Sequence, residues 1–129
     1  MKLFEKYLPL DVIRYIDSFL YSKLNNENIH QAVDLWCQDK EQCKIIYGHI
    51  SYWKTGKVTD MSSMFSRTIF FNSKISRWNV SNVTTMYCMF YFACSFNSDI
   101  SQWNVSNVTD RSDIFYDCNI EKHHKPHFN

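Results

Sequence analysis

Hydrophobic and polar residues recur in the second half of the chain with a period of 25 residues. The segment Trp-Asn-Val-Ser-Asn-Val-Thr occurs twice without change, at 78–84 and 103–109. A period of this length is typical of repeat proteins, which bury their apolar residues by stacking one unit on the next. We therefore predict three stacked repeats over residues 49–118. Their core is expected to consist of the recurring large apolar residues Trp53, Trp78, Trp103, Val58, Val83, Val108, Phe65, Phe90 and Phe115.

Each repeat unit combines two hydrophobic patterns. A short Ile-Ser-x-Trp sequence, rich in residues that favour strands, occurs at 50–53, 75–78 and 100–103. After it, Val58, Met61, Met64 and Phe65 have a spacing that places them on one face of a helix. The Asn-x-Ser/Thr sequences between these elements suit tight turns. We therefore predict an α/β repeat solenoid, similar to leucine-rich repeats, with three strand–short-helix coils and an α-helical N-terminal cap.

The first half of the chain has helical spacing instead. Residues 1–24 are predicted to form an amphipathic helix, because Val12, Ile16 and Phe19 fall on one face. Residues 25–48 are predicted to be a helical segment that caps the stack, and its last helix, 40–47, should begin after Asp39 and end at Gly48. Residues 119–129 contain few large apolar groups, so we expect a flexible tail.

Two resemblances follow from these motifs. The pattern Ile-Ser-x-Trp-Asn-Val-Ser-Asn-Val-Thr-x-Met, followed by Met-Phe and Phe-Asn, resembles the BspA-like leucine-rich-repeat family over residues 29–118. That family is known from bacterial surface proteins and lipoproteins, and from protists and large DNA viruses. The resemblance implies protein binding or adhesion and no catalytic residue. Residues 8–20 resemble the opening helix of an F-box, which implies docking to a ubiquitin-ligase adaptor.

Composition excludes several classes of function. The chain has 14 Lys and Arg against 13 Asp and Glu, a net charge of +1, which argues against nucleic acid as a partner. Its two glycines cannot form a glycine-rich phosphate loop. No apolar run approaches the roughly 18 residues of a membrane span, and no signal peptide is recognisable. Five cysteines without a CxxC pair indicate reduced thiols, so we expect a cytoplasmic protein, with surface exposure as the alternative.

No catalytic, cofactor or metal site is expected. Cys118, His123, His124 and His127 include residue types that bind zinc, but they lie in a polar terminal segment. Cys37 and His49 are the pair considered for nucleophilic catalysis, and no acid follows them at a diagnostic spacing. We therefore expect that the protein is not an enzyme.

Variable positions between the inward-facing residues of each repeat are the predicted interaction surface. They are Tyr52, Arg77 and Gln102, joined by Lys54, Asn79 and Asn104. We therefore predict a non-enzymatic protein–protein interaction module. An F-box-type substrate adaptor and a cell-surface adhesion protein are the alternatives. Because Arg111 replaces a core methionine in the last repeat, we also expect self-association through an uncovered C-terminal coil.

Overall fold

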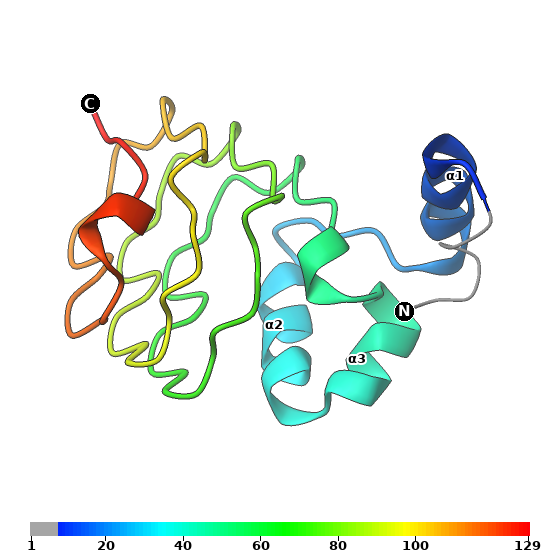
Figure 1. Cartoon of the computed structure of the whole chain (residues 1–129), viewed down its shortest axis with the longest axis horizontal. Coiled ribbons are helices and arrows are strands. Elements are labelled where there is room, and N and C mark those ends of the chain that lie inside the picture. Colours follow the sequence, from blue (N-terminus) through cyan, green and yellow to red (C-terminus); the bar gives the residue numbers. More distant parts are fainter. Residues whose placement is uncertain (1–7) are drawn as a thin grey trace.

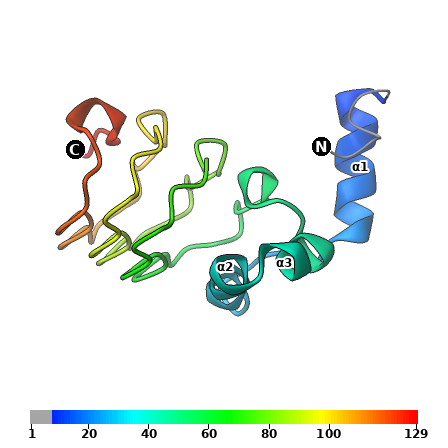
Figure 2. The same cartoon turned by 60° about the horizontal axis from the view of Figure 1, so that its bottom comes forward.

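The computed structural model describes residues 8–129, in which helices precede a stack of coils (Figures 1 and 2). The α-helices are α1 (Leu10–Leu20), α2 (Ile29–Gln38) and α3 (Lys40–Tyr47). Two 3-10 helices, η2 (Ile50–Tyr52) and η3 (Lys122–His124), lie at the start and the end of the stack. Both views place α2 and α3 at one end of the stack and α1 beyond them. Residues 1–7 of the predicted N-terminal helix lie outside the described range.

Two features of the sequence explain the helices before the stack: apolar residues at helical spacing, which are buried, and capping residues at the helix ends. α2 buries Ile29, Ala32, Val33 and Trp36, which recur at helical spacing. The side chain of Asp39 accepts a hydrogen bond from the backbone N–H of Gln42 (3.1 Å) and so caps the start of α3. Gly48, with a φ of 77°, ends α3 in a conformation that glycine tolerates best. The predicted helix over 40–47 is confirmed.

Three successive coils, at 50–74, 75–99 and 100–124, lie side by side and share backbone hydrogen bonds. Phe65 N donates to Met89 O (2.8 Å), and Phe90 N donates to Ile114 O (2.9 Å). Equivalent bonds join every second residue over 61–67 to the next coil and over 86–92 to the third. The 25-residue period therefore sets the register, since a repeated residue meets its counterpart in the neighbouring coil.

The coils consist of turns, and the prediction of an α/β repeat solenoid is wrong. Within residues 8–129, β-pairing is confined to isolated parallel bridges that join Asp60 to Thr85 and Thr85 to Asp110. The predicted strands are replaced by η2 in the first coil and by turns in the other two. The predicted short helices are also replaced by turns, because two residues in each coil have a positive φ that interrupts a helix: Ser63, Arg67, Cys88, Phe92, Asp113 and Asp117. The structure is therefore not of the leucine-rich-repeat type either.

Aromatic side chains stack through the interior in rows. The rings of Trp53 and Trp78 are stacked 5.9 Å apart, and those of Phe65, Phe90 and Phe115 follow one another at 5.4 and 5.7 Å. The recurring tryptophans and Phe65, Phe90, Val58 and Val83 are buried, whereas Val108 and Phe115 in the last coil are partly buried. The recurring indoles also donate to backbone carbonyls: Trp53 Nε1 to Gly48 O (2.9 Å), Trp78 Nε1 to Ile50 O (2.8 Å) and Trp103 Nε1 to Ile75 O (3.1 Å). The stacked aromatic side chains therefore stabilise the coils both by burying apolar surface and by hydrogen bonds between coils.

The C-terminal segment lies against the last coil instead of forming the free tail that we expected. Ile100 N donates to His124 O (3.0 Å), and Ile120 is buried. The guanidinium of Arg111 lies over the ring of Phe128, 4.8 Å from its centroid. The polar composition of residues 119–129 does not predict this packing, because the packing depends on backbone hydrogen bonds and on two apolar residues, Ile120 and Phe128. The C-terminal segment therefore covers part of the last coil, while Val108 and Phe115 stay partly exposed, and self-association through this end stays a prediction.

Candidate functional site

A groove lies between α1 and the first two coils. Leu10 and Ile13 of α1 form one wall, and residues 51–56 with Arg77 and Asn79 form the other. The groove has a volume of about 840 Å³. We call it the α1 groove.

A second cavity, which we call the tyrosine pocket, continues the α1 groove toward α3. It has a volume of about 370 Å³, and Tyr21, Leu24 and Tyr47 form its apolar lining. Tyr52, Trp53 and Lys54 line both cavities, so the two form one continuous surface.

The turn of η2 positions the shared residues. His49 Nδ1 accepts from Ser51 N (3.2 Å) at the start of this turn, and Trp53 N donates to Ile50 O at its end (3.3 Å). As a result the side chain of Trp53 points inward, 4% exposed, while that of Tyr52 remains 51% exposed. The guanidinium of Arg77 lies over the Tyr52 ring, 5.1 Å from its centroid, which fixes both side chains at the rim.

Four of the six residues of the predicted interaction surface line the α1 groove. These are Tyr52, Lys54, Arg77 and Asn79. Gln102 and Asn104 are exposed on the third coil, outside the groove. The sequence did not indicate that Leu10 and Ile13 would form the opposite wall. The only signal was the amphipathic pattern of residues 8–20, which shows an apolar face but not what the face lies against.

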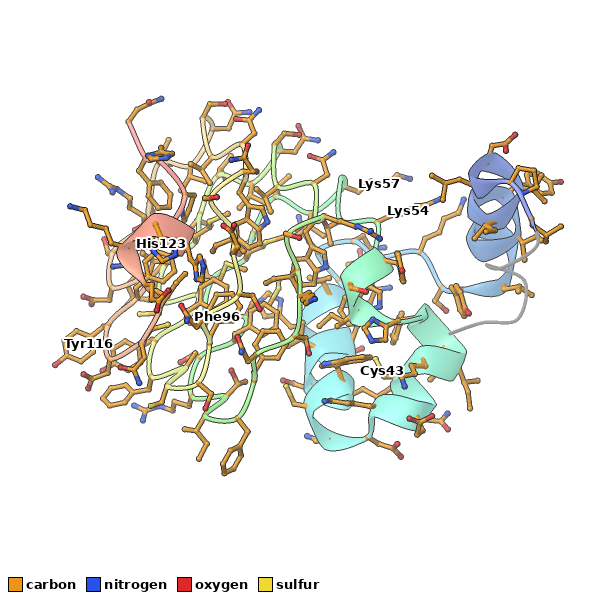
Figure 3. All side chains as sticks on the ribbon, in the orientation of Figure 1. Cys43, Lys54, Lys57, Phe96, Tyr116 and His123 are labelled. Carbon is orange, nitrogen blue, oxygen red and sulfur yellow. The ribbon has the colours of Figure 1, made fainter. Side chains whose placement is uncertain are left out.

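The charge of this surface is positive. Lys23, Lys54 and Lys57 line the tyrosine pocket and Arg77 lines the α1 groove, and among the side chains that the structure describes no carboxylate lines either cavity. Figure 3 places Lys54 and Lys57 on the side of the stack that faces α1. Among residues 8–129, no ion pair within 4 Å involves Lys57 or Arg77. Exposed apolar groups therefore lie beside positive charge on this surface, and within the described part of the chain Lys57 and Arg77 form no ion pair.

Cys37 and His49, the pair considered for nucleophilic catalysis, have environments that do not favour it. His49 packs edge-on against Trp36 (4.8 Å between ring centroids) and bonds to Ser51 through Nδ1. Desolvation, followed by the charge of Asp34, raises the pKa of the Cys37 thiol. A raised pKa lowers the fraction of the thiolate, which is the nucleophilic form. This pair therefore carries no argument for nucleophilic catalysis.

The C-terminal residues considered as metal ligands do not come together as a set of four. Within the described range, ligand atoms of Glu121, His123 and His124 converge, without Cys118 or His127. Cys118 donates from Sγ to Phe96 O (3.7 Å). The candidate metal ligands in the structure are therefore Glu121, His123 and His124, a set that includes a carboxylate and differs from the set suggested by residue types.

No helix in residues 8–129 has the length and apolar character needed to span a membrane.

Comparison with known proteins identifies one family. Residues 20–127 match the model of the family described as "Mycoplasma protein of unknown function, DUF285". No curated protein and no solved structure matches the chain. The resemblance to BspA-like leucine-rich repeats is therefore wrong, since the match is to a different family and the coils are built of turns. The F-box resemblance gains no support, because the match begins at the last residue of α1.

Proposed function

This chain belongs to the DUF285 family, and we propose that it is a non-enzymatic protein–protein interaction module. In this proposal, an acidic, apolar segment of a partner protein binds in the α1 groove. The observation that carries the proposal is the combination of exposed apolar walls and a positive rim at one continuous surface.

The apolar walls support a protein partner. Leu10 and Tyr52, on opposite walls, are 61% and 51% exposed. Burying such side chains against a ligand contributes about 1.5–3 kcal/mol for a full side chain. An amphipathic segment that lies along the groove would cover both walls at once, as helices do in hydrophobic grooves.

The charge supports an acidic partner. Lys57 and Arg77 stand at the rim, and a segment with Glu or Asp beside its apolar residues would meet them. Salt screens contacts of this kind, because the Debye length falls to about 8 Å at physiological ionic strength. Binding should therefore weaken as salt is added. The chain's net charge of +1 gives no comparable support for a nucleic-acid partner.

The proposal is tested with a defined probe. A fluorescent helical peptide with leucine on one face and glutamate on the other is titrated with the full chain, and anisotropy is measured. A peptide with lysine in place of glutamate serves as the comparison. We expect the acidic peptide to bind with a dissociation constant in the micromolar range and the basic peptide to bind at least ten-fold more weakly.

Charge-reversal variants locate the binding. Lys57→Glu combined with Arg77→Glu should weaken the acidic peptide at least ten-fold. The matched control is Lys74→Glu combined with Lys122→Glu, which makes the same change in net charge at exposed residues outside the groove. The proposal fails if the wild-type chain does not bind the acidic peptide, or if the control pair weakens binding as much as the groove pair.

A further inference from the structure

The terminal turn η3 gathers side chains that bind transition metals. Glu121, His123 and His124 each offer one ligand atom, and these atoms all lie within 4.8 Å of one another. Glu121 Oε2 is 3.4 Å from His123 Nε2 and 3.8 Å from His124 Nδ1. Figure 3 shows His123 on this turn at the end of the stack opposite α1.

Asn97 fixes the protonation of His124. The Oδ1 atom of Asn97 accepts from the backbone N–H of Glu121 (2.9 Å), which establishes the orientation of its amide. The same oxygen lies 3.0 Å from His124 Nδ1, and because an oxygen of this kind only accepts, Nδ1 must carry the proton. The lone pair of neutral His124 is therefore on Nε2, where it is available to a metal. A metal-binding histidine usually has such a partner on its other nitrogen.

The backbone of the turn is held in place before any ion binds. His124 O accepts from Ile100 N (3.0 Å), and His124 N donates to Glu121 O (3.0 Å). Ile120, beside the turn, is buried. Two ligands of a tetrahedral ion are about 3.3–3.4 Å apart when each bond is about 2.0–2.1 Å long. The distance of 3.4 Å between Glu121 Oε2 and His123 Nε2 already fits. The His124 nitrogen that lies 3.8 Å from Glu121 is Nδ1, which donates to Asn97, so the His124 ring must present Nε2 to the ion.

We propose that Glu121, His123 and His124 bind a Zn²⁺ ion, with water in the fourth position. Two imidazoles and one carboxylate form a ligand set that zinc accepts. Glu121 supplies the negative charge of this ligand set. The positive charges of Lys122 and Lys125 disfavour binding of a cation. The ammonium group of Lys125 is held over the Phe115 ring, 5.3 Å from its centroid.

The three ligands lie within four residues of one another, and Asn97 of the preceding coil orients two of them in the folded chain, because its Oδ1 atom accepts from Glu121 N and lies 3.0 Å from His124 Nδ1. An ion would therefore bind the folded turn more tightly than the unfolded segment. Tighter binding to the folded state stabilises the fold by mass action. Zinc should therefore raise the melting temperature as well as bind.

The test is calorimetric titration of the full chain with ZnCl₂. We expect one ion per chain with a dissociation constant in the micromolar range. Glu121→Gln, His123→Ala and His124→Ala should each weaken binding at least ten-fold, whereas His127→Ala, in the same segment, and His30→Ala should change it less than two-fold. Glu121 and His123 are exposed, so their variants are expected to fold, and circular dichroism checks this.

Cobalt distinguishes this site from the cysteines. The absorption spectrum of the Co²⁺-loaded chain should lack thiolate charge-transfer bands, and zinc should raise the melting temperature of the wild type but not of His123→Ala. The proposal is overturned if no ion binds in a one-to-one ratio, if the His123→Ala/His124→Ala double variant binds as the wild type does, or if the cobalt spectrum shows thiolate ligands.

Discussion

Replacing Trp78 by alanine removes a side chain from the middle of the stacked core. Trp78 is 3% exposed, and its ring lies 5.9 Å from that of Trp53 and 5.7 Å from that of Phe65. Its indole N–H donates to Ile50 O at 2.8 Å. The substitution therefore removes ring contacts on the neighbouring coil and one hydrogen bond between coils.

The expected loss in the free energy of unfolding has two parts. Emptying a buried site of this size costs about 3–5 kcal/mol. The lost hydrogen bond adds about 1 kcal/mol, at the lower end of the cost of an unpaired buried group, because Ile50 O keeps its bond from Trp53 N. Since domains of this kind are stable by only about 5–15 kcal/mol, Trp78→Ala should lose a large share of its stability. Trp78→Phe keeps an aromatic ring and loses the N–H, so it should cost about 1–2 kcal/mol.

Urea denaturation measures both variants against the wild type. Far-ultraviolet circular dichroism and the fluorescence of the remaining tryptophans should give coincident transitions for a two-state protein. The order of stability should be wild type, then Trp78→Phe, then Trp78→Ala. A loss below about 1 kcal/mol for Trp78→Ala would refute the reasoning, because it is too small for emptying a buried aromatic site.

Three further predictions follow from local geometry. Gly48→Ala should destabilise the fold by at least about 1 kcal/mol in urea, because φ is 77° and a Cβ would lie 3.0 Å from the Tyr21 ring; Gly56→Ala, the matched control, should cost less. Removing residues 119–129 should expose the Phe115 side of the last coil and cause concentration-dependent self-association in sedimentation, and a monomeric truncated chain would contradict this. Burial, with a smaller contribution from Cys37, raises the pKa of Cys43 to about 11, above the usual value of about 8.5, so the unfolded chain loses this proton first. Its contribution to stability should therefore be complete below about pH 8.5 and fall as pH rises toward 11, and Cys43→Ala should reduce that fall in denaturation measured across this range.

The 25-residue period correctly predicted which side chains of neighbouring coils lie in contact, but it did not predict their backbone conformation. A 25-residue spacing brings Trp53 beside Trp78 whether the chain between them is strand, helix or turn. The turns depend on a positive φ at residues such as Ser63 and Arg67, where no glycine signals it. The spacing of Val58, Met61 and Phe65 fits one face of a helix, yet the backbone N–H groups of Met61 and Phe65 bond to the next coil. Hydrophobic periodicity alone does not distinguish these two outcomes.

The candidate site was predictable on one wall only. Alternation around the buried tryptophans indicated that Tyr52 and Arg77 face outward, and both line the α1 groove. The wall formed by Leu10 and Ile13 depends on the position of α1 relative to the coils. A hydrogen bond from Ser22 N, just after α1, to Ile46 O of α3 (2.9 Å) helps to set this position. That bond joins residues far apart in the sequence and leaves no local pattern. Glu121, His123 and His124 are neighbours in the sequence, but the orientation of Glu121 and His124 depends on hydrogen bonds with Asn97, one coil earlier.

Nuclear magnetic resonance mapping of the acidic peptide on the ¹⁵N-labelled full chain tests the central proposal most directly. The chain is titrated with the Leu/Glu peptide, and the shift of each backbone amide is followed. We expect the largest shifts at the residues that line the α1 groove and the adjoining tyrosine pocket, which include Leu10, Ile13, residues 51–57, Arg77 and Asn79. Saturable shifts confined to the third coil, or no saturable shifts at all, would contradict it.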